Sequence, residues 1–228
     1  MGGTLDLFAW FDPQALAIVA GGSILVACLR ATRPEMAGAL AALHPLLRAN
    51  PDADAAAARH VVSRAHAIAE TKHLVCVDRI ANTGAFLAEA VRHLSDARSS
   101  VAFARWADEA LEGRRCRHAG VIAFWRAMAD AAPAMGMIAT VIGLIRMFRA
   151  MEDASKIGAP MATALVATLL GLVIANLIAG PIADRLERLS AAELAWQRRT
   201  LDHFSALARA ELDQAIGLQR SLARSVAR

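Results

Sequence analysis

The sequence lacks the residue patterns that mark the common enzyme active sites. It contains no glycine-rich phosphate loop followed by Lys and Ser or Thr, and no His-Glu-x-x-His pattern. None of the seven histidines lies in a long apolar run, and His60, His66 and His73 are spaced too irregularly to form a metal face on one helix. These absences predict a protein that is not an enzyme and that binds no metal or cofactor.

Cysteines and clusters of aromatic with basic residues are also scarce. The three cysteines have neither the spacing of zinc ligands nor the even number of a disulfide framework. The formal net charge is +4, but no platform of aromatic side chains accompanies the basic residues, as it does in proteins that bind single-stranded nucleic acid. Nucleic acid is therefore not an expected partner.

Charge is missing from three long apolar stretches. Residues 13–29 contain no charged side chain, and neither does the run between Asp130 and Arg146 or the run between Lys156 and Asp184. A helix of roughly 20 apolar residues crosses the hydrocarbon core of a bilayer, with snorkelling side chains at its ends. We therefore expect three membrane-spanning helices, the last two of which form a hairpin in the lipid bilayer.

The placement of the remaining charges divides the chain into four predicted parts. These are an N-terminal transmembrane helix over residues 1–30, a helical domain over 31–120, a transmembrane hairpin over 121–184 and a C-terminal helix over 185–228. Basic residues follow the first and the last span, which predicts that both flanks face the cytoplasm. The expected fold class is an all-α membrane protein with a cytoplasmic helical domain and a long C-terminal helix that continues the last span.

Few helix-breaking signals interrupt the predicted cytoplasmic domain. The clearest is Asn50-Pro51-Asp52, and weaker ones stand at Asn82-Thr83-Gly84 and at Gly113. No segment shows a strand signal. We expect a bundle of three to five helices in this region.

Small residues lie at the centre of each expected span. Gly21 and Gly22 lie in the first span, Gly136 in the first arm of the hairpin and Gly171 in its second arm. Small side chains let membrane helices approach closely, so these four glycines are predicted to serve helix packing. The alternative, that they reflect the general tolerance of membrane helices for glycine, remains open.

Hydroxyl and amide side chains also lie inside the hairpin: Thr140 in the first arm, and Thr163, Thr168 and Asn176 in the second. A polar atom in hydrocarbon must find a partner, so it usually faces protein or water. A threonine can instead bond back to the carbonyl four residues earlier in its own helix. The glycines near Thr140 and Thr168 favour a pore or a partner groove over this alternative.

No carboxylate or lysine lies in the middle of any expected span. A path for protons or cations normally needs a titratable or coordinating group at depth in the membrane. The chain alone is therefore incomplete as an ion conductor. Either a second chain supplies the acid, or this chain is a passive scaffold.

Three segments of the hairpin together resemble a known family. They are Asp130-Ala-Ala-Pro-Ala-Met-Gly-Met-Ile-Ala-Thr-Val-Ile-Gly-Leu-Ile, Ile157-Gly-Ala-Pro-Met-Ala-Thr-Ala-Leu-Val-Ala-Thr-Leu-Leu-Gly and Ala175-Asn-Leu-Ile-Ala-Gly-Pro-Ile-Ala-Asp-Arg-Leu. They resemble the last two membrane helices of the MotA/TolQ/ExbB proton channel family, nearer to MotA and PomA than to ExbB or TolQ. The run Ile18-Val-Ala-Gly-Gly-Ser-Ile-Leu-Val is similar to the second membrane helix of the MotA group.

This resemblance implies a stator-type A subunit of the flagellar motor in the bacterial inner membrane. Such subunits form a homo-pentamer around two copies of a single-span B subunit of the MotB or PomB type. The membrane aspartate of the B subunit would carry H⁺ or Na⁺, and ion flow would turn the ring. This arrangement would account for the missing acid.

The resemblance also assigns roles to four positions of this sequence. Pro133 and Pro181 match two prolines that are tied to coupling in MotA. Thr168 matches the threonine that faces the aspartate of the partner, and Thr140 stands where sodium-type subunits have threonine and proton-type subunits have alanine. Thr140 and Thr168 are thus expected to line the ion pathway, and a sodium pathway is one expectation.

Two departures from the MotA pattern affect these expectations. MotA-type subunits begin with an additional membrane helix, for which we expect no room here, which leaves either three spans or a wrongly assigned start. The region that meets a flagellar rotor protein in MotA usually offers an Arg followed by acidic residues. Here Lys72 and Asp78 are the candidate rotor contacts, and ordinary surface charges are the alternative.

Two other functions remain open at this point. An ExbB- or TolQ-like unit would use the same ion chemistry to energise a process in the cell envelope. A non-conducting membrane scaffold would use its small-residue stripes only to pack helices.

Overall fold

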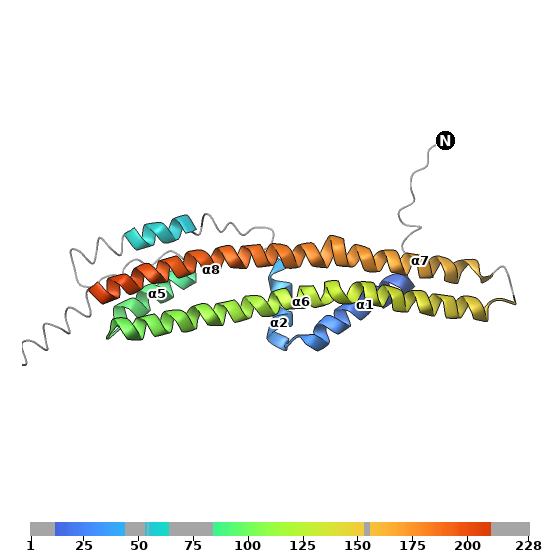
Figure 1. The fold of residues 1–228 in the computed structure, drawn as a ribbon, viewed down its shortest axis with the longest axis horizontal. Coiled ribbons are helices and arrows are strands. Elements are labelled where there is room, and N and C mark those ends of the chain that lie inside the picture. The colour runs from blue at the N-terminus through green and yellow to red at the C-terminus, as the bar shows by residue number, and fades with distance from the viewer. Residues whose placement is uncertain (1–11, 44–52, 54, 64–83, 153–155, 211–228) are drawn as a thin grey trace, which may run out of the picture. The chain divides into compact units, whose positions relative to one another are not determined.

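The computed structural model describes residues 12–43, 53, 55–63, 84–152 and 156–210 of the chain (Figure 1). Within these ranges every regular element is a helix, as predicted. The elements are α1 (Pro13–Arg30), α2 (Arg33–Ala41), a helical segment over 55–63, α5 (Gly84–Asp96), α6 (Ser100–Arg149), α7 (Gly158–Val173), the π-helical turn η4 (Ile174–Ala179) and α8 (Gly180–Ala208).

Three stretches of helix are long and apolar enough to cross a membrane. They are α1, a part of α6, and a part of the continuous run from α7 through η4 into α8. This agrees with the three predicted spans. The last span continues without a break into the charged C-terminal region, because no glycine stop lies between residues 181 and 189.

The chain divides into two compact units, which are described separately. The first contains residues 1–48 and 117–188, and the second contains residues 49–116 and 189–228. α6 and α8 each contribute to both units.

In the first unit, α1 begins at an N-cap formed by Asp12. Its carboxylate accepts hydrogen bonds from the backbone N–H groups of Gln14 and Ala15, at 2.8 and 3.3 Å. Pro13 occupies the first helical position, where a missing N–H costs nothing. α1 packs against α7, and its buried Ser23 donates back to the carbonyl of Val19 at 2.7 Å.

α2 follows α1 after a short connection and begins with a capping box. The backbone N–H of Thr32 donates to Glu35 at 2.6 Å, and this bond lowers the pKa of the Glu35 carboxyl. The indole Nε1 of Trp125 in α6 donates to the carbonyl of Ala39 at 3.4 Å. This bond ties α2 to α6 within the first unit.

α6 is a single helix of 50 residues and corrects one expectation. The helix passes through Gly113, where the sequence suggested a weak break. A glycine inside a helix costs only about 1 kcal/mol relative to alanine, and the strong helix formers around it, such as Leu111 and Arg114, outweigh that. Gly84, the other weak signal, does mark a boundary, because α5 starts there with a positive φ of 67°.

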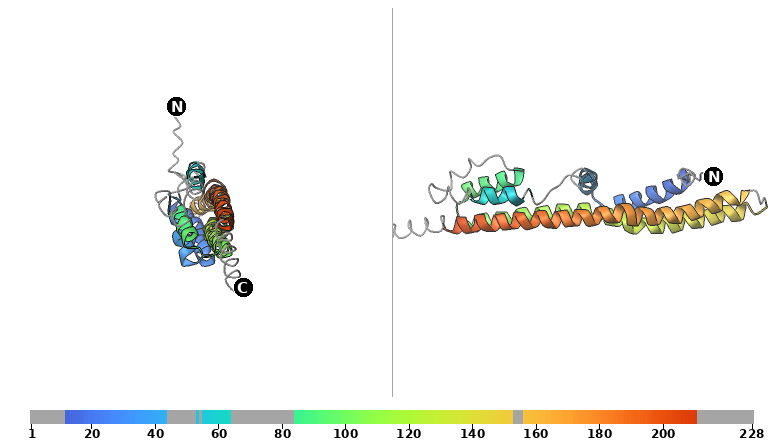
Figure 2. Two further views of the ribbon diagram at one scale, coloured as in Figure 1. Left: turned by 90° about the vertical axis from the view of Figure 1, so that its left-hand side faces the viewer. Right: turned by 90° about the horizontal axis from the view of Figure 1, so that it is seen from above.

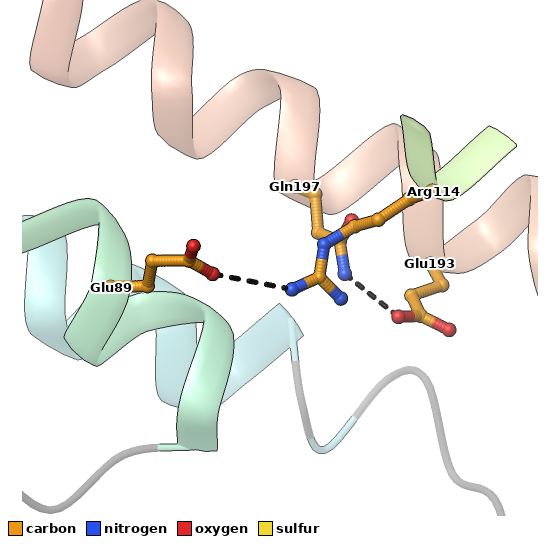
Figure 3. A network of polar contacts seen from close by, with 4 residues as sticks. All are labelled: Glu89, Arg114, Glu193 and Gln197. Atoms are coloured by element: carbon orange, nitrogen blue, oxygen red, sulfur yellow. Dashed lines mark hydrogen bonds and ion pairs between the residues drawn. The ribbon is translucent and has the colours of Figure 1, made fainter. Parts of the chain in front are cut away.

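The second unit has a core of large side chains. The rings of Phe86 and Trp196 meet edge to face at 5.6 Å, and the Arg114 guanidinium lies 4.6 Å from the centre of the Phe86 ring. Figure 3 shows the polar border of this core, where Arg114 lies 3.8 Å from Glu89. Nearby, the Gln197 amide donates to Glu193 at 2.7 Å.

Candidate functional site

The two arms of the hairpin, α6 and α7, lie side by side and antiparallel (Figures 1 and 2). A Cβ atom added to Gly171 would lie 2.7 Å from the backbone oxygen of Ala132, and one added to Gly136 would lie 3.1 Å from that of Ala167. Real Cβ atoms essentially never approach closer than 3.0 Å. The two helices therefore touch backbone to backbone, and at Gly171 only glycine allows this approach.

One helical turn away, a hydroxyl of α6 meets a hydroxyl of α7. The Oγ1 atoms of Thr140 and Thr168 are 2.5 Å apart. Thr140 Oγ1 also lies 2.9 Å from the carbonyl oxygen of Gly136 and 3.1 Å from that of Ala164. The back-bond within the helix and the contact across the hairpin, which the sequence left as alternatives, thus occur together at Thr140.

The number of hydroxyl protons in this cluster determines which threonine donates the hydrogen bond and which accepts it. Thr140 has one hydroxyl proton for two carbonyl oxygens, so Thr168 is the natural donor to Thr140. Thr168 is exposed, and Thr140 is half-buried behind it. The exposed side of the cluster presents oxygen atoms, which are the ligands of hard cations such as Na⁺ and of hydrated protons.

The two predicted coupling prolines lie in different backbone settings. Pro133 is half-buried inside α6, one turn before Gly136. Pro181 is exposed and follows the π-helical turn η4 directly. A π turn is wider than an α turn and is often found at functional sites. In this turn the N–H of Gly180 donates to the carbonyl of Ala175.

The two glycines of α1 differ in their surroundings. A Cβ atom on Gly22 would meet the end of the flexible Met135 side chain, whereas one on Gly21 would meet nothing within 4 Å. Lys72 and Asp78, the candidate rotor contacts, lie outside the described residues. In the described part of the chain, no group of three or more His, Cys, Asp or Glu residues gathers as a metal site would require.

The structure adds two polar contacts that the sequence did not indicate. At one end of the first unit, Arg146 of α6 donates to Gln14 of α1 at 2.9 Å. At the other end, Arg126 of α6 pairs with Glu187 of α8. No sequence signal could have found either pair, because the partners are 132 and 61 residues apart.

Asp12 adjoins the first of these contacts. Its pKa is lowered, chiefly by the hydrogen bond with the Thr163 hydroxyl of α7, while burial, the next largest cause, acts in the opposite direction. The N–H groups at the start of α1 and the charge of Arg146 lower the pKa further. The carboxylate thus stays ionised and holds the starts of α1 and α7 together.

Comparison with known proteins defines the class. The sequence pattern of the MotA/TolQ/ExbB proton channel family matches residues 79–198, more than half of the chain. This chain belongs to that family, whose members are non-enzymatic components of ion channels and stators. It is therefore a membrane protein, in accord with its three apolar helices.

Individual relatives narrow the class to stator A subunits of the MotA and PomA type. "Chemotaxis protein PomA" of Vibrio alginolyticus is 33% identical over 190 residues, covering 82% of this chain and 72% of that protein. "Motility protein A" of Treponema pallidum is 31% identical over 182 residues, covering 78% of this chain and 69% of that protein.

Solved stator structures share the fold. The C. jejuni MotAB structure superimposes with a TM-score of 0.76 at 18% identity, covering 89% of this chain and 80% of that chain. The Bacillus subtilis flagellar MotAB stator complex gives a TM-score of 0.73 at 20% identity, covering 95% of this chain and 86% of that chain.

Proposed function

We propose that this chain is the ion-conducting ring subunit of a stator complex in the bacterial inner membrane. Five copies would surround two copies of a single-span B subunit of the MotB or PomB type, and ion flow would drive rotation of the ring. The observation that carries this proposal is the Thr140–Thr168 cluster, a group of oxygen atoms between two membrane helices with Thr168 on its exposed side.

The absence of an acid explains the need for a partner. No Asp, Glu, Lys or Arg lies between Asp130 and Arg146 or between Lys156 and Asp184. The hydroxyl cluster can replace part of the hydration shell of a cation, but it cannot neutralise the charge. A membrane aspartate on the B subunit would supply the neutralising charge, with the threonines completing the oxygen shell.

Thr140 supports sodium as the transported ion. Its hydroxyl brings Thr168 and the carbonyl of Ala164 to one point, and an alanine there would remove both contacts. Na⁺ needs several oxygen ligands at once, whereas a proton can pass along a shorter chain of hydroxyls and water. The proposed ion is therefore Na⁺, with H⁺ as the alternative that the experiment separates.

The relatives that are named motility and chemotaxis proteins favour a motor output over an ExbB- or TolQ-like process. The same names also count against a non-conducting scaffold, because motility requires a protein that does mechanical work. Torque would pass to a flagellar rotor protein through the cytoplasmic part of the chain, where Lys72 and Asp78 remain the predicted contacts.

The test measures ion flux through the A–B complex in proteoliposomes, with the plug of the B subunit removed. Sodium and proton gradients are applied separately to the wild type, Thr140→Ala and Thr168→Val. We expect Thr168→Val to lose flux, because it removes the exposed hydroxyl. Thr140→Ala should lower sodium flux relative to proton flux by about tenfold, which corresponds to the loss of one good ligand.

Ser23→Ala is the matched control, because Ser23 is a buried hydroxyl whose hydrogen bonds, among the described residues, stay within its own helix. Its flux should equal that of the wild type. A wild-type complex that conducts neither ion would refute the proposed function, and normal flux through Thr168→Val would refute the lining role of Thr168.

A further inference from the structure

The π turn η4 and Pro181 together leave one backbone carbonyl without a helical donor. The carbonyl of Asn176 would accept from Gly180 in an α-helix and from residue 181 in a π-helix. The N–H of Gly180 donates to Ala175 instead, and Pro181 has no N–H. Within the described residues, the backbone oxygen of Asn176 therefore lacks the donor that a regular helix would supply.

The side chain of the same residue adds a second acceptor. The Asn176 amide donates from Nδ2 to the carbonyl of Leu172 at 2.9 Å, which fixes the amide and directs Oδ1 away from that carbonyl. Asn176 is exposed, and within the described residues its Oδ1 has no donor. Within the described residues, Asn176 thus presents two oxygen acceptors without a donor, beside the second proton of its Nδ2 group.

These oxygens lie inside the apolar part of the helix. Asn176 is in the uncharged run between Lys156 and Asp184, eight residues before Asp184. At 1.5 Å per residue, that places it about 12 Å along the helix from the first charge. Unpaired acceptors at this depth are costly in hydrocarbon, so they must face water, a cation or a donor from another chain.

Asn176 also shares a helix face with Thr168. The two residues are eight apart, which is slightly more than the 7.2 residues of two α-helical turns. The π turn between them holds more residues per turn and so reduces the overshoot. Both side chains are exposed. The exposed face therefore carries two groups of oxygens about 12 Å apart along the helix.

We propose that Asn176 forms a second site for the transported cation, on the cytoplasmic side of the Thr140–Thr168 cluster. The backbone oxygen and Oδ1 bind the ion with its remaining water after it leaves the threonines. Two oxygen acceptors outnumber the one remaining proton of Nδ2, so the site favours a cation over an anion. Free carbonyls at interrupted membrane helices bind Na⁺ or H⁺ in the same way in transporters. The site rests on the proposed function.

The test uses sidedness, because a release site acts on one side only. The A–B complex is oriented in vesicles and sodium is supplied either from the cytoplasmic face or from the opposite face. For Asn176→Leu we expect the half-saturating sodium concentration to rise about tenfold from the cytoplasmic face and to stay unchanged from the other. Asn176→Gln, which keeps the amide oxygen, should recover part of this loss.

Leu177→Ala is the matched control, since Leu177 is the exposed apolar neighbour in the same π turn. It should leave both half-saturating concentrations unchanged. If the wild type conducts only protons, the two faces are compared instead by the proton concentration that gives half-maximal flux, with the pH varied on one face at a time. An equal change from both faces, or no change, overturns the site while leaving the proposed function intact.

Two further outcomes are distinguishable. If Asn176→Leu no longer co-purifies with the B subunit, Asn176 accepts a bond from that partner and the cation site is overturned. If the wild type conducts no ion, the proposed function fails, and this site fails with it.

Discussion

The two units of this chain differ in the size of the side chains that fill their cores. The buried hydrophobic residues of the first unit are mostly alanine, among them Ala132, Ala139 and Ala167. Those of the second unit include Phe86, Trp196 and Phe204. Lipid is as apolar as a leucine side chain, so membrane helices gain little by burying large side chains and instead gain by close contact. In water, burying large apolar surface is the main driving force.

The comparison teaches that the same substitution should have different effects in the two units. A deletion of volume should damage the second unit most, because a cavity remains. An addition of volume should damage the first unit most, because no space exists between α6 and α7. Two predictions test this contrast and two more test the helix caps of the first unit, from the largest expected effect to the smallest.

Phe204→Ala should give the largest loss of stability. Phe204 is only 1% exposed in the core of the second unit, and removing a buried phenylalanine ring costs about 3–5 kcal/mol. Denaturant unfolding of the purified protein in detergent, followed by tryptophan fluorescence, measures the loss. The exposed neighbour Asp202→Ala is the control. A loss for Phe204→Ala of less than about 1 kcal/mol would contradict the assigned core.

Gly171→Ala should destabilise the first unit by about 1–3 kcal/mol, because the new Cβ atom meets the Ala132 carbonyl. Gly21→Ala, in open space, should have the opposite sign and stabilise α1 by about 0.5–1 kcal/mol. Thermal unfolding of both variants in the same detergent compares them directly. Equal effects of the two substitutions would show that backbone contact does not hold α6 to α7.

Asp12→Ala should cost about 0.5–2 kcal/mol, because α1 loses its N-cap. Asp130→Ala is the matched control, since Asp130 is an exposed aspartate inside α6 that caps no helix. Thermal unfolding again measures the effect, and Asp12→Asn should recover most of it, as asparagine caps equally well. An effect of Asp130→Ala as large as that of Asp12→Ala would argue against capping.

The pH dependence of stability should be the smallest effect. Asp12 and Glu35 both have lowered pKa values in the folded chain. Their contribution is therefore fully present above the ordinary carboxyl range near pH 4, and it is lost as pH falls through that range to the lowered values. Melting temperatures between pH 6 and pH 3 measure it. Glu35→Ala should remove the part that belongs to Glu35, because it deletes the carboxylate that accepts from the Thr32 N–H, and an unaltered slope would count against the capping box.

Much of the fold was predictable because a helix that crosses lipid needs a run of roughly 20 residues without charge. The uncharged runs placed the three spans, and the absence of a stop after Pro181 placed the continuation into α8. The predicted weak break at Gly113 was wrong, because a single glycine among strong helix formers does not end a helix.

The detail of the site was only partly predictable. Spacing placed Thr140 and Thr168 on small-residue faces of their helices, but only the register between α6 and α7 brings their hydroxyls together. The π turn at Ile174–Ala179 has no recognisable sequence pattern. Its residues are as apolar as those of a regular membrane helix, so the sequence does not show where the helix widens. The pairs Arg146–Gln14 and Arg126–Glu187 depend on tertiary structure alone.

The backbone contact between Gly136 and Gly171 has a mechanical consequence. Two helices that touch without intervening side chains cannot slide past each other, so this part of the hairpin is stiff and moves as one body. The turn before Pro181 lacks the hydrogen bond that an N–H at position 181 would donate, and so it has a lower bending stiffness. Elastic deformation of the last membrane helix therefore concentrates at a single turn, which acts as the joint of an otherwise rigid lever.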